Sequence, residues 1–73
     1  MNALADDYPF EVCVQSAAEH YDGYSDCYAT KADAMATAWS RLQELSEYYR
    51  GLVATVYYRG GVIASISQDE LTS

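Results

Sequence analysis

Residues 30–51 read TKADAMATAWSRLQELSEYYRG, and this stretch has the pattern of one amphipathic helix. Thr30 and Asp33 have the Thr-x-x-Asp spacing of a capped helix start, where an early acid suits the positive end of the helix dipole. Gly51 suits the left-handed position that follows a helix, so the helix is predicted to end at Arg50. Apolar positions recur every three or four residues, as a core-facing stripe requires. The stripe consists of Met35, Ala38, Trp39, Leu42, Leu45 and Tyr49.

Two pairs of strand-like segments flank the predicted helix. Strands are predicted over 10–15, 24–30, 52–59 and 62–67, from alternating or β-branched residues. A polar loop over 17–23 joins the first pair, and a tight turn at Arg59-Gly60-Gly61 joins the second. The sequence therefore predicts an α+β fold of the order ββαββ, with a four-stranded antiparallel sheet and the helix packed on one face. It forms a single domain, 1–73, with frayed ends at 1–8 and 68–73.

Alternation along each strand predicts which residues face the helix. In the outer strands small residues occupy both alternations, so the facing of the second and fourth strands stays open. Cys27 and Ala29 are expected to face inward, because the opposite facing would bury Asp26. The other residues predicted to face the core are Val12, Val14, Ala54, Val56, Tyr58, Val62, Ala64 and Ile66. The side without a helix is then expected to expose Tyr24, Tyr28, Val53, Tyr57 and Ile63.

Composition excludes several classes of function. The 73 residues suffice for one small core, and 51% of them are hydrophobic. Eleven acidic residues against four Lys and Arg give a formal charge of −7, which repels phosphates and anionic headgroups. Direct binding to nucleic acid or to a membrane is therefore not expected. With an acidic start and no long apolar run, the chain is predicted to be soluble and cytoplasmic.

The search for catalytic or metal-binding motifs is negative. His20 has no nucleophile in an activating context beside it, so no catalytic triad can be assembled. Cys13 and Cys27 are too widely spaced for a structural zinc site with His20, and they are predicted to be free thiols. Asp22 and Asp26 lack the ligand series of a calcium loop. The sequence predicts no enzyme activity, no cofactor and no metal.

Negative charge is concentrated in the first hairpin. Residues 1–30 contain six acids and no Lys or Arg, whereas residues 31–73 contain five acids and four bases. Carboxylates interleaved with Tyr offer acceptors for Arg and Lys, together with flat rings for a contact core. The predicted partner-binding residues are Glu11, Glu19, Asp22, Tyr24, Asp26 and Tyr28. Such a surface suits a protein partner with a basic groove.

A short, acidic, Tyr-rich domain with a ββαββ plan over 10–67 resembles the anti-CRISPR proteins of phages and mobile elements, several of which mimic DNA. The resemblance rests on size, charge and this plan, and on no shared motif. It implies an inhibitor that binds a CRISPR surveillance complex at the groove that receives DNA. An alternative from another class is a small homodimeric structural or adaptor protein. It would pair through its exposed sheet face, with Val53, Tyr57 and Ile63 in the contact.

Overall fold

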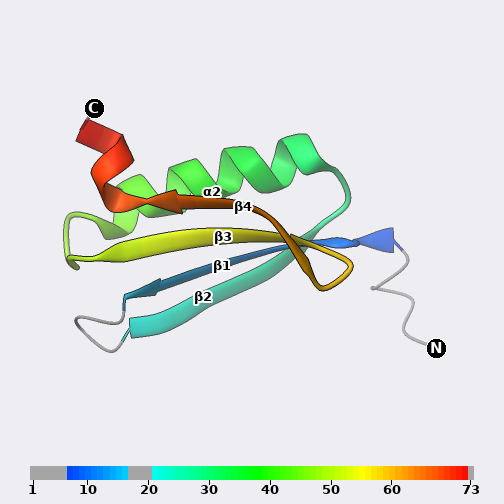
Figure 1. Cartoon of the computed structure of the whole chain (residues 1–73), viewed down its shortest axis with the longest axis horizontal. Coiled ribbons are helices and arrows are strands. Elements are labelled where there is room, and N and C mark those ends of the chain that lie inside the picture. Colours follow the sequence, from blue (N-terminus) through cyan, green and yellow to red (C-terminus); the bar gives the residue numbers. More distant parts are fainter. Residues whose placement is uncertain (1–6, 17–20, 73) are drawn as a thin grey trace.

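The computed structural model describes residues 7–16 and 21–72 (Figure 1). Its elements are β1 (Phe10–Ser16), β2 (Tyr21–Tyr28), α2 (Lys31–Leu45), β3 (Leu52–Tyr58), β4 (Gly61–Ser67) and the 3₁₀ helix η1 (Gln68–Thr72). The strands form one antiparallel sheet in the order β2-β1-β3-β4. The predicted α+β fold, with four strands and one helix packed on one face of the sheet, is confirmed.

Helix α2 runs across one face of the sheet and contacts mainly the two central strands, β1 and β3 (Figure 1). A helix is about 10 Å wide with its side chains, whereas four strands span about 19 Å at 4.8 Å each. One helix therefore covers the middle of the sheet and leaves both edge strands partly open on its own side. This difference in width decides the exposure of several side chains on β2.

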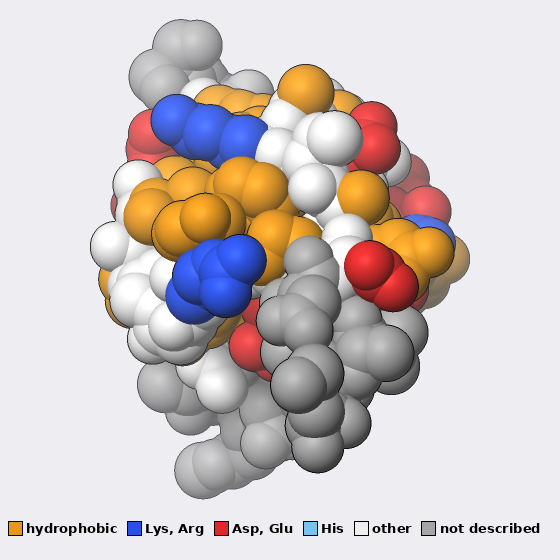
Figure 2. Space-filling view, turned by 90° about the vertical axis from the view of Figure 1, so that its right-hand side faces the viewer, with side chains coloured by type: hydrophobic (Ala, Val, Ile, Leu, Met, Phe, Trp, Pro, Cys, Tyr) orange, Lys and Arg blue, Asp and Glu red, His pale blue; other side chains and the backbone are white. Residues whose placement is uncertain are grey.

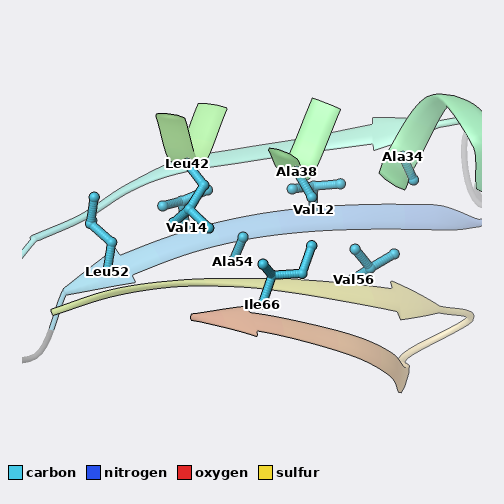
Figure 3. Packing of buried hydrophobic residues seen from close by; sticks show 9 residues of the cluster. All are labelled: Val12, Val14, Ala34, Ala38, Leu42, Leu52, Ala54, Val56 and Ile66. Atoms are coloured by element: carbon cyan, nitrogen blue, oxygen red, sulfur yellow. The ribbon is translucent and has the colours of Figure 1, made fainter. Parts of the chain in front are cut away.

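The core forms where small helix residues approach the central strands (Figure 3). Ala34, Ala38 and Leu42 of α2 are fully buried, and their side chains point toward strand residues such as Val12 and Val56. The whole cluster is Val12, Val14, Ala34, Ala38, Leu42, Leu52, Ala54, Val56 and Ile66. Alanine allows a close approach of helix to sheet, so the line through Ala34 and Ala38 faces inward.

The helix is oriented so that one large residue of the predicted apolar stripe does not face the core. Trp39 was predicted to lie in the core, but its side chain is 38% exposed. Met35, Leu45 and Tyr49 pack at the margin of the core as half-buried residues. The bulky indole lies beside the narrow line of alanines rather than on it, because a Trp on that line would hold the helix away from the sheet.

The start of α2 agrees with the prediction, and its end does not. The Thr30 side chain accepts a hydrogen bond from the Asp33 N–H at 3.1 Å, as a helix cap should. The helix ends at Leu45 with Ser46 as its C-cap, five residues before the predicted end at Arg50. Gly51 does adopt a positive φ of 70°, but in the connection to β3.

The segment after β4 holds the end of the helix in place. It was predicted to be a frayed polar tail, and the described part instead forms η1, with Leu71 packed against the core. The Gln68 amide donates to the carbonyls of Tyr49 at 3.0 Å and Ser46 at 3.4 Å, and its oxygen accepts the Leu52 N–H at 3.2 Å. Carbonyl groups that would have continued the helix are therefore satisfied by a side chain from η1.

The turn between β3 and β4 is one residue shorter than predicted. Tyr58 pairs with Gly61, so Arg59 and Gly60 form a two-residue turn, both with positive φ. The pairing then shifts, because Ile63 is an extra residue opposite Tyr57. This bulge places Val62 opposite Tyr57 on the side away from the helix, so the prediction that Val62 faces the core is wrong.

Candidate protein-binding surfaces

The predicted partner-binding residues do not lie on a single face of the sheet. Val12 pairs with Asp26 and Val14 with Tyr24, so these β2 residues share the helix side with the buried valines. Tyr28 lies on the same side, opposite Phe10. The expectation that Tyr24, Asp26 and Tyr28 face away from the helix is wrong. Glu11 does face away from it, beside Cys27 and Tyr57 on the neighbouring strands.

Asp26 remains exposed even though it lies on the helix side. Strand β2 is an edge strand, and α2 lies chiefly over β1 and β3. The desolvation penalty that favoured the opposite facing therefore does not arise. One Asp26 carboxylate oxygen accepts the N–H of Cys27 at 2.8 Å. Because an acceptor on its own strand occupies this N–H, it is not available to a further strand.

Tyr24 and Tyr28 connect the edge strand to the flank of the helix. Their hydroxyl groups are hydrogen-bonded to each other, and both side chains are half-buried. The Arg41 guanidinium lies 5.1 Å from the centre of the Tyr24 ring, within the range of a cation–π contact. Arg41 also forms an ion pair with Glu44 at 2.9 Å on the helix. The two tyrosines thus act as attachment points for the hairpin.

The environment of this tyrosine pair changes its acidity. Burial, followed by the hydrogen bond with Tyr24, raises the pKa of Tyr28 to about 12, against an opposing hydrogen bond from Thr37. The Tyr28 phenol therefore keeps its proton to a higher pH than an exposed tyrosine does. A separate interaction, in which the Arg41 guanidinium donates to the Tyr24 hydroxyl, raises the pKa of Arg41, and the charge of Glu44 raises it further.

Two of the predicted contact residues cannot be placed. Glu19 lies outside the described residues, and the side chain of Asp22 is not described. Of the six predicted residues, the structure leaves Glu11 and Asp26 as placed carboxylates on opposite faces of the hairpin. A partner that contacts both must therefore reach around the edge of β2.

The sheet face away from the helix, which we call the open face, is not covered by any described element (Figure 1). Its described residues are Glu11, Cys13, Gln15, Ser25, Cys27, Val53, Thr55, Tyr57, Val62, Ile63, Ser65 and Ser67. The residues predicted for a second interface, Val53, Tyr57 and Ile63, all lie on it, the last at the bulge. Val62, Ile63 and Tyr57 form an apolar corner at the β3–β4 end, where Val62 is 61% exposed.

A small polar cluster occupies the β1–β2 half of the open face. The Ser25 hydroxyl donates to a Glu11 carboxylate oxygen at 3.1 Å. The Cys13 sulfur lies 3.6 Å from the Ser25 hydroxyl and 3.7 Å from the same Glu11 oxygen. Burial, opposed by the hydrogen bond to Ser25 and assisted by the charge of Glu11, raises the pKa of the Cys13 thiol. Cys13 and Cys27 are both free thiols.

At both edges of the sheet, an acidic side chain accepts a hydrogen bond from a backbone N–H group of the edge strand. At β2 the Asp26 carboxylate takes the N–H of Cys27, and at β4 the Glu70 carboxylate takes the N–H of Ser67, each at 2.8 Å. Acidic side chains that occupy edge N–H groups discourage pairing with another strand. Sequence analysis missed both contacts, although acids on or just beyond an edge strand are a signal that could have suggested them.

The end of the molecule with the β3–β4 turn and the start of α2 has a different character. Figure 2 shows hydrophobic side chains gathered between two groups of Lys and Arg at this end. The Phe10 and Tyr58 rings lie 4.8 Å apart, and the Arg59 guanidinium lies 5.6 Å from the Tyr58 ring. Figure 2 also shows Asp and Glu side chains at this end, so charges of both signs surround the apolar groups.

The described residues were searched for metal-binding groups and pockets. No group of three or more His, Cys, Asp or Glu side chains within 7–16 and 21–72 is arranged to hold a metal ion. An open pocket of about 380 Å³ lies between the end of α2 and η1, with Ser46, Arg50, Gln68 and Leu71 in its wall. Its polar groups hold the chain together there, since Gln68 and Arg50 both bind helix-end carbonyls.

None of the helices in the part of the chain that is described is long and apolar enough to cross a membrane. Comparison with known proteins found no matching family model, no matching curated protein and no matching solved structure.

Proposed function

We propose that this protein is a non-catalytic inhibitor that binds a basic, nucleic-acid-binding groove of a bacterial defence complex and excludes DNA from it. The observation that carries the proposal is the charge of the first 30 residues, which hold six acids and no Lys or Arg. A surface with this charge attracts a groove lined by Lys and Arg and speeds the encounter with it. The proposed site of action is the cytoplasm of the host cell.

The geometry supports a contact centred on the edge strand β2. Asp26 is exposed at this edge, and Glu11 lies on the adjacent strand facing the other way. A groove wide enough to hold a nucleic-acid duplex can surround an edge and reach carboxylates on both of its faces. The contact surface therefore differs from the one predicted from sequence, in which the tyrosines would have touched the partner.

Tyr24 and Tyr28 have a supporting role in this proposal. Through their paired hydroxyl groups and the Arg41 contact, they hold β2 against the helix. A hairpin held in one position loses little conformational entropy when a partner binds it. The carboxylates of β2 are then presented at fixed positions, as an imitation of regularly spaced phosphates requires.

The experiment is a DNA-competition assay on a complex captured by the tagged protein from a bacterial lysate that contains active CRISPR and restriction systems. The captured complex should lose its DNA in proportion to added protein. The test variant is the double change Glu11→Gln and Asp26→Asn, which keeps the shapes and the acceptor for the Cys27 N–H. Its matched control is Glu44→Gln with Glu47→Gln, which removes the same charge from the helix side.

The test variant should compete about tenfold less well, since two contacts of roughly 0.5–1 kcal/mol each are lost. The control should compete as wild type does, and added salt should weaken the wild-type competition. If both variants weakened equally, total charge rather than the β2 edge would be responsible. Failure of the wild type to displace any DNA would overturn the proposal.

A further inference from the structure

The open face has an unusual charge for this chain. The protein carries a formal charge of −7, yet Glu11 is the only acidic or basic side chain among the described residues of the open face. The remaining described residues there are Ser, Thr, Gln, Cys, Val, Ile and Tyr. From this neutrality and from the extent of the face, we propose that the open face is a self-association surface that takes a second copy of this chain.

The charge of the open face indicates which kind of protein can bind there. A basic partner gains little from a surface with one carboxylate when the edge of β2 and the exposed side of the helix carry acids. A second copy of a −7 chain, in contrast, can approach only through a surface that is close to neutral. Glu11 itself is engaged by the Ser25 hydroxyl at 3.1 Å, which leaves less of its charge to be desolvated.

The face is large enough for a specific but weak pair. Four strands at 4.8 Å and seven residues at 3.4 Å give about 450 Å² of flat sheet per copy. Two such faces bury about 900 Å² in total, which is the size of a weak, transient interface. The apolar corner of Tyr57, Val62 and Ile63, with Val53 further along β3, supplies the groups that gain from leaving water.

The two edges of the sheet favour packing of two copies face to face over addition of a strand at an edge. The Asp26 and Glu70 carboxylates occupy the edge N–H groups of Cys27 and Ser67, so extension of the sheet by another strand would have to displace them. Two sheets packed face to face, about 10 Å apart, need no free edge. The exposed Asp26 at the β2 edge remains outside such a pair, whereas Glu11 on the open face would be covered by it. Self-association therefore competes with the proposed contact of both carboxylates, and it does not depend on the proposed function.

The experiment is sedimentation equilibrium of the wild-type chain over a range of protein and salt concentrations. We expect a monomer–dimer equilibrium with a dimer of twice 8.1 kDa, favoured by added salt because salt screens the repulsion between two acidic chains. Binding to a basic partner has the opposite salt dependence, so the two proposals can fail separately. A chain that stays monomeric at every concentration and salt would overturn self-association and leave the face for a different protein.

The variant Thr55→Arg tests the surface itself. Thr55 lies in the middle of the open face, between Cys13 and Ser65, so an Arg there can reach water in the monomer but is buried in the pair. Burying an unpaired charge should weaken association about a hundredfold. The control, Ser40→Arg, adds the same charge on the exposed side of the helix and should leave association unchanged.

A second readout follows the open face directly, first in the wild-type chain and then in the variant. The exposed Cys27 thiol lies on the open face and can be alkylated with iodoacetamide. Its rate of alkylation should fall as the wild-type concentration rises and should stay constant in Thr55→Arg. A dimer that is unaffected by Thr55→Arg, with Cys27 still reactive, would place the contact elsewhere and contradict the proposal.

Discussion

Replacement of Tyr28 by Phe tests whether the tyrosine pair holds the acidic hairpin against the helix. The change removes one hydroxyl group and leaves the ring in place, so packing is conserved. The hydroxyl of Tyr28 is hydrogen-bonded to that of Tyr24. This bond contributes about 0.5–1.5 kcal/mol, and water can replace part of it at a half-buried site. We expect a loss of about 1 kcal/mol in the free energy of unfolding at pH 7.

The dependence on pH gives this prediction a distinctive signature. The pKa of Tyr28 is raised to about 12 in the folded chain, whereas an unfolded tyrosine titrates near pH 10. The folded state thus binds the phenolic proton more tightly, so this stabilisation is complete below pH 10 and is lost as pH rises to 12. A shift of two units corresponds to about 2.7 kcal/mol, and solvent access to the half-buried ring reduces it to about 1–2 kcal/mol.

Urea unfolding followed by circular dichroism, at a series of pH values from 7 to 12, measures the difference between wild type and Tyr28→Phe. The advantage of the wild type should shrink above pH 10 and disappear near pH 12. Tyr48→Phe is the matched control, because Tyr48 is 72% exposed and its loss should change stability by less than about 0.5 kcal/mol. An advantage that stays constant from pH 7 to 12, or none at pH 7, would refute the reasoning.

Three further changes test how the fold is held together. Gln68→Ala removes three hydrogen bonds, which together contribute about 2 kcal/mol to the free energy of unfolding. This free energy typically falls by about 1 kcal/mol for each molar of urea, so the urea midpoint should fall by about 2 M. The control Gln43→Ala, at an exposed position, should leave the midpoint unchanged. Arg59→Gly should raise the melting temperature by about 2–4 °C, because Arg59 has a φ of 50° that glycine adopts at no steric cost, and a fall would contradict this explanation. Leu42→Ala should lower the free energy of unfolding, measured by calorimetry, by about 2–5 kcal/mol, and Trp39→Ala should lower it by only about 1 kcal/mol. Equal losses would contradict the observed orientation of the helix, in which Leu42 is buried and Trp39 is partly exposed.

The order of elements could be predicted because each signal is local. Alternation over 10–15, the cap at Thr30 and the turn after Tyr58 each specify a few neighbouring residues, and the structure contains all three. The end of the helix could not be predicted in this way. It depends on Gln68, which is more than twenty residues away in the sequence and binds the carbonyl groups at that point.

The side of the sheet on which the β2 residues lie could not be predicted, for a different reason. Sequence analysis assigned Asp26 to the side away from the helix because burial of a carboxylate is costly. That argument holds only if the helix covers every strand, and a helix about 10 Å wide cannot cover four strands. Strand order, which alternation does not reveal, placed β2 at the edge. The bulge at Ile63 similarly turns the Val62 side chain to the face away from the helix. The extra residue in β4 that causes this cannot be recognised from the alternation of the sequence.

Placement of charge links the two proposed surfaces. The carboxylates of Asp26 and Glu70 occupy edge N–H groups and so discourage pairing with a further strand, and in the proposed function Asp26 would also attract the basic partner. The open face lacks this protection and nearly lacks charge, which would make it a liability in a protein that must remain monomeric. A dimer resolves the conflict, because it covers the neutral face and carries two acidic β2 edges. If both proposals hold, Glu11 is covered in the dimer while Asp26 stays exposed, so a basic groove and a second copy should compete for the chain. Addition of the basic partner should then shift the sedimentation equilibrium toward the monomer.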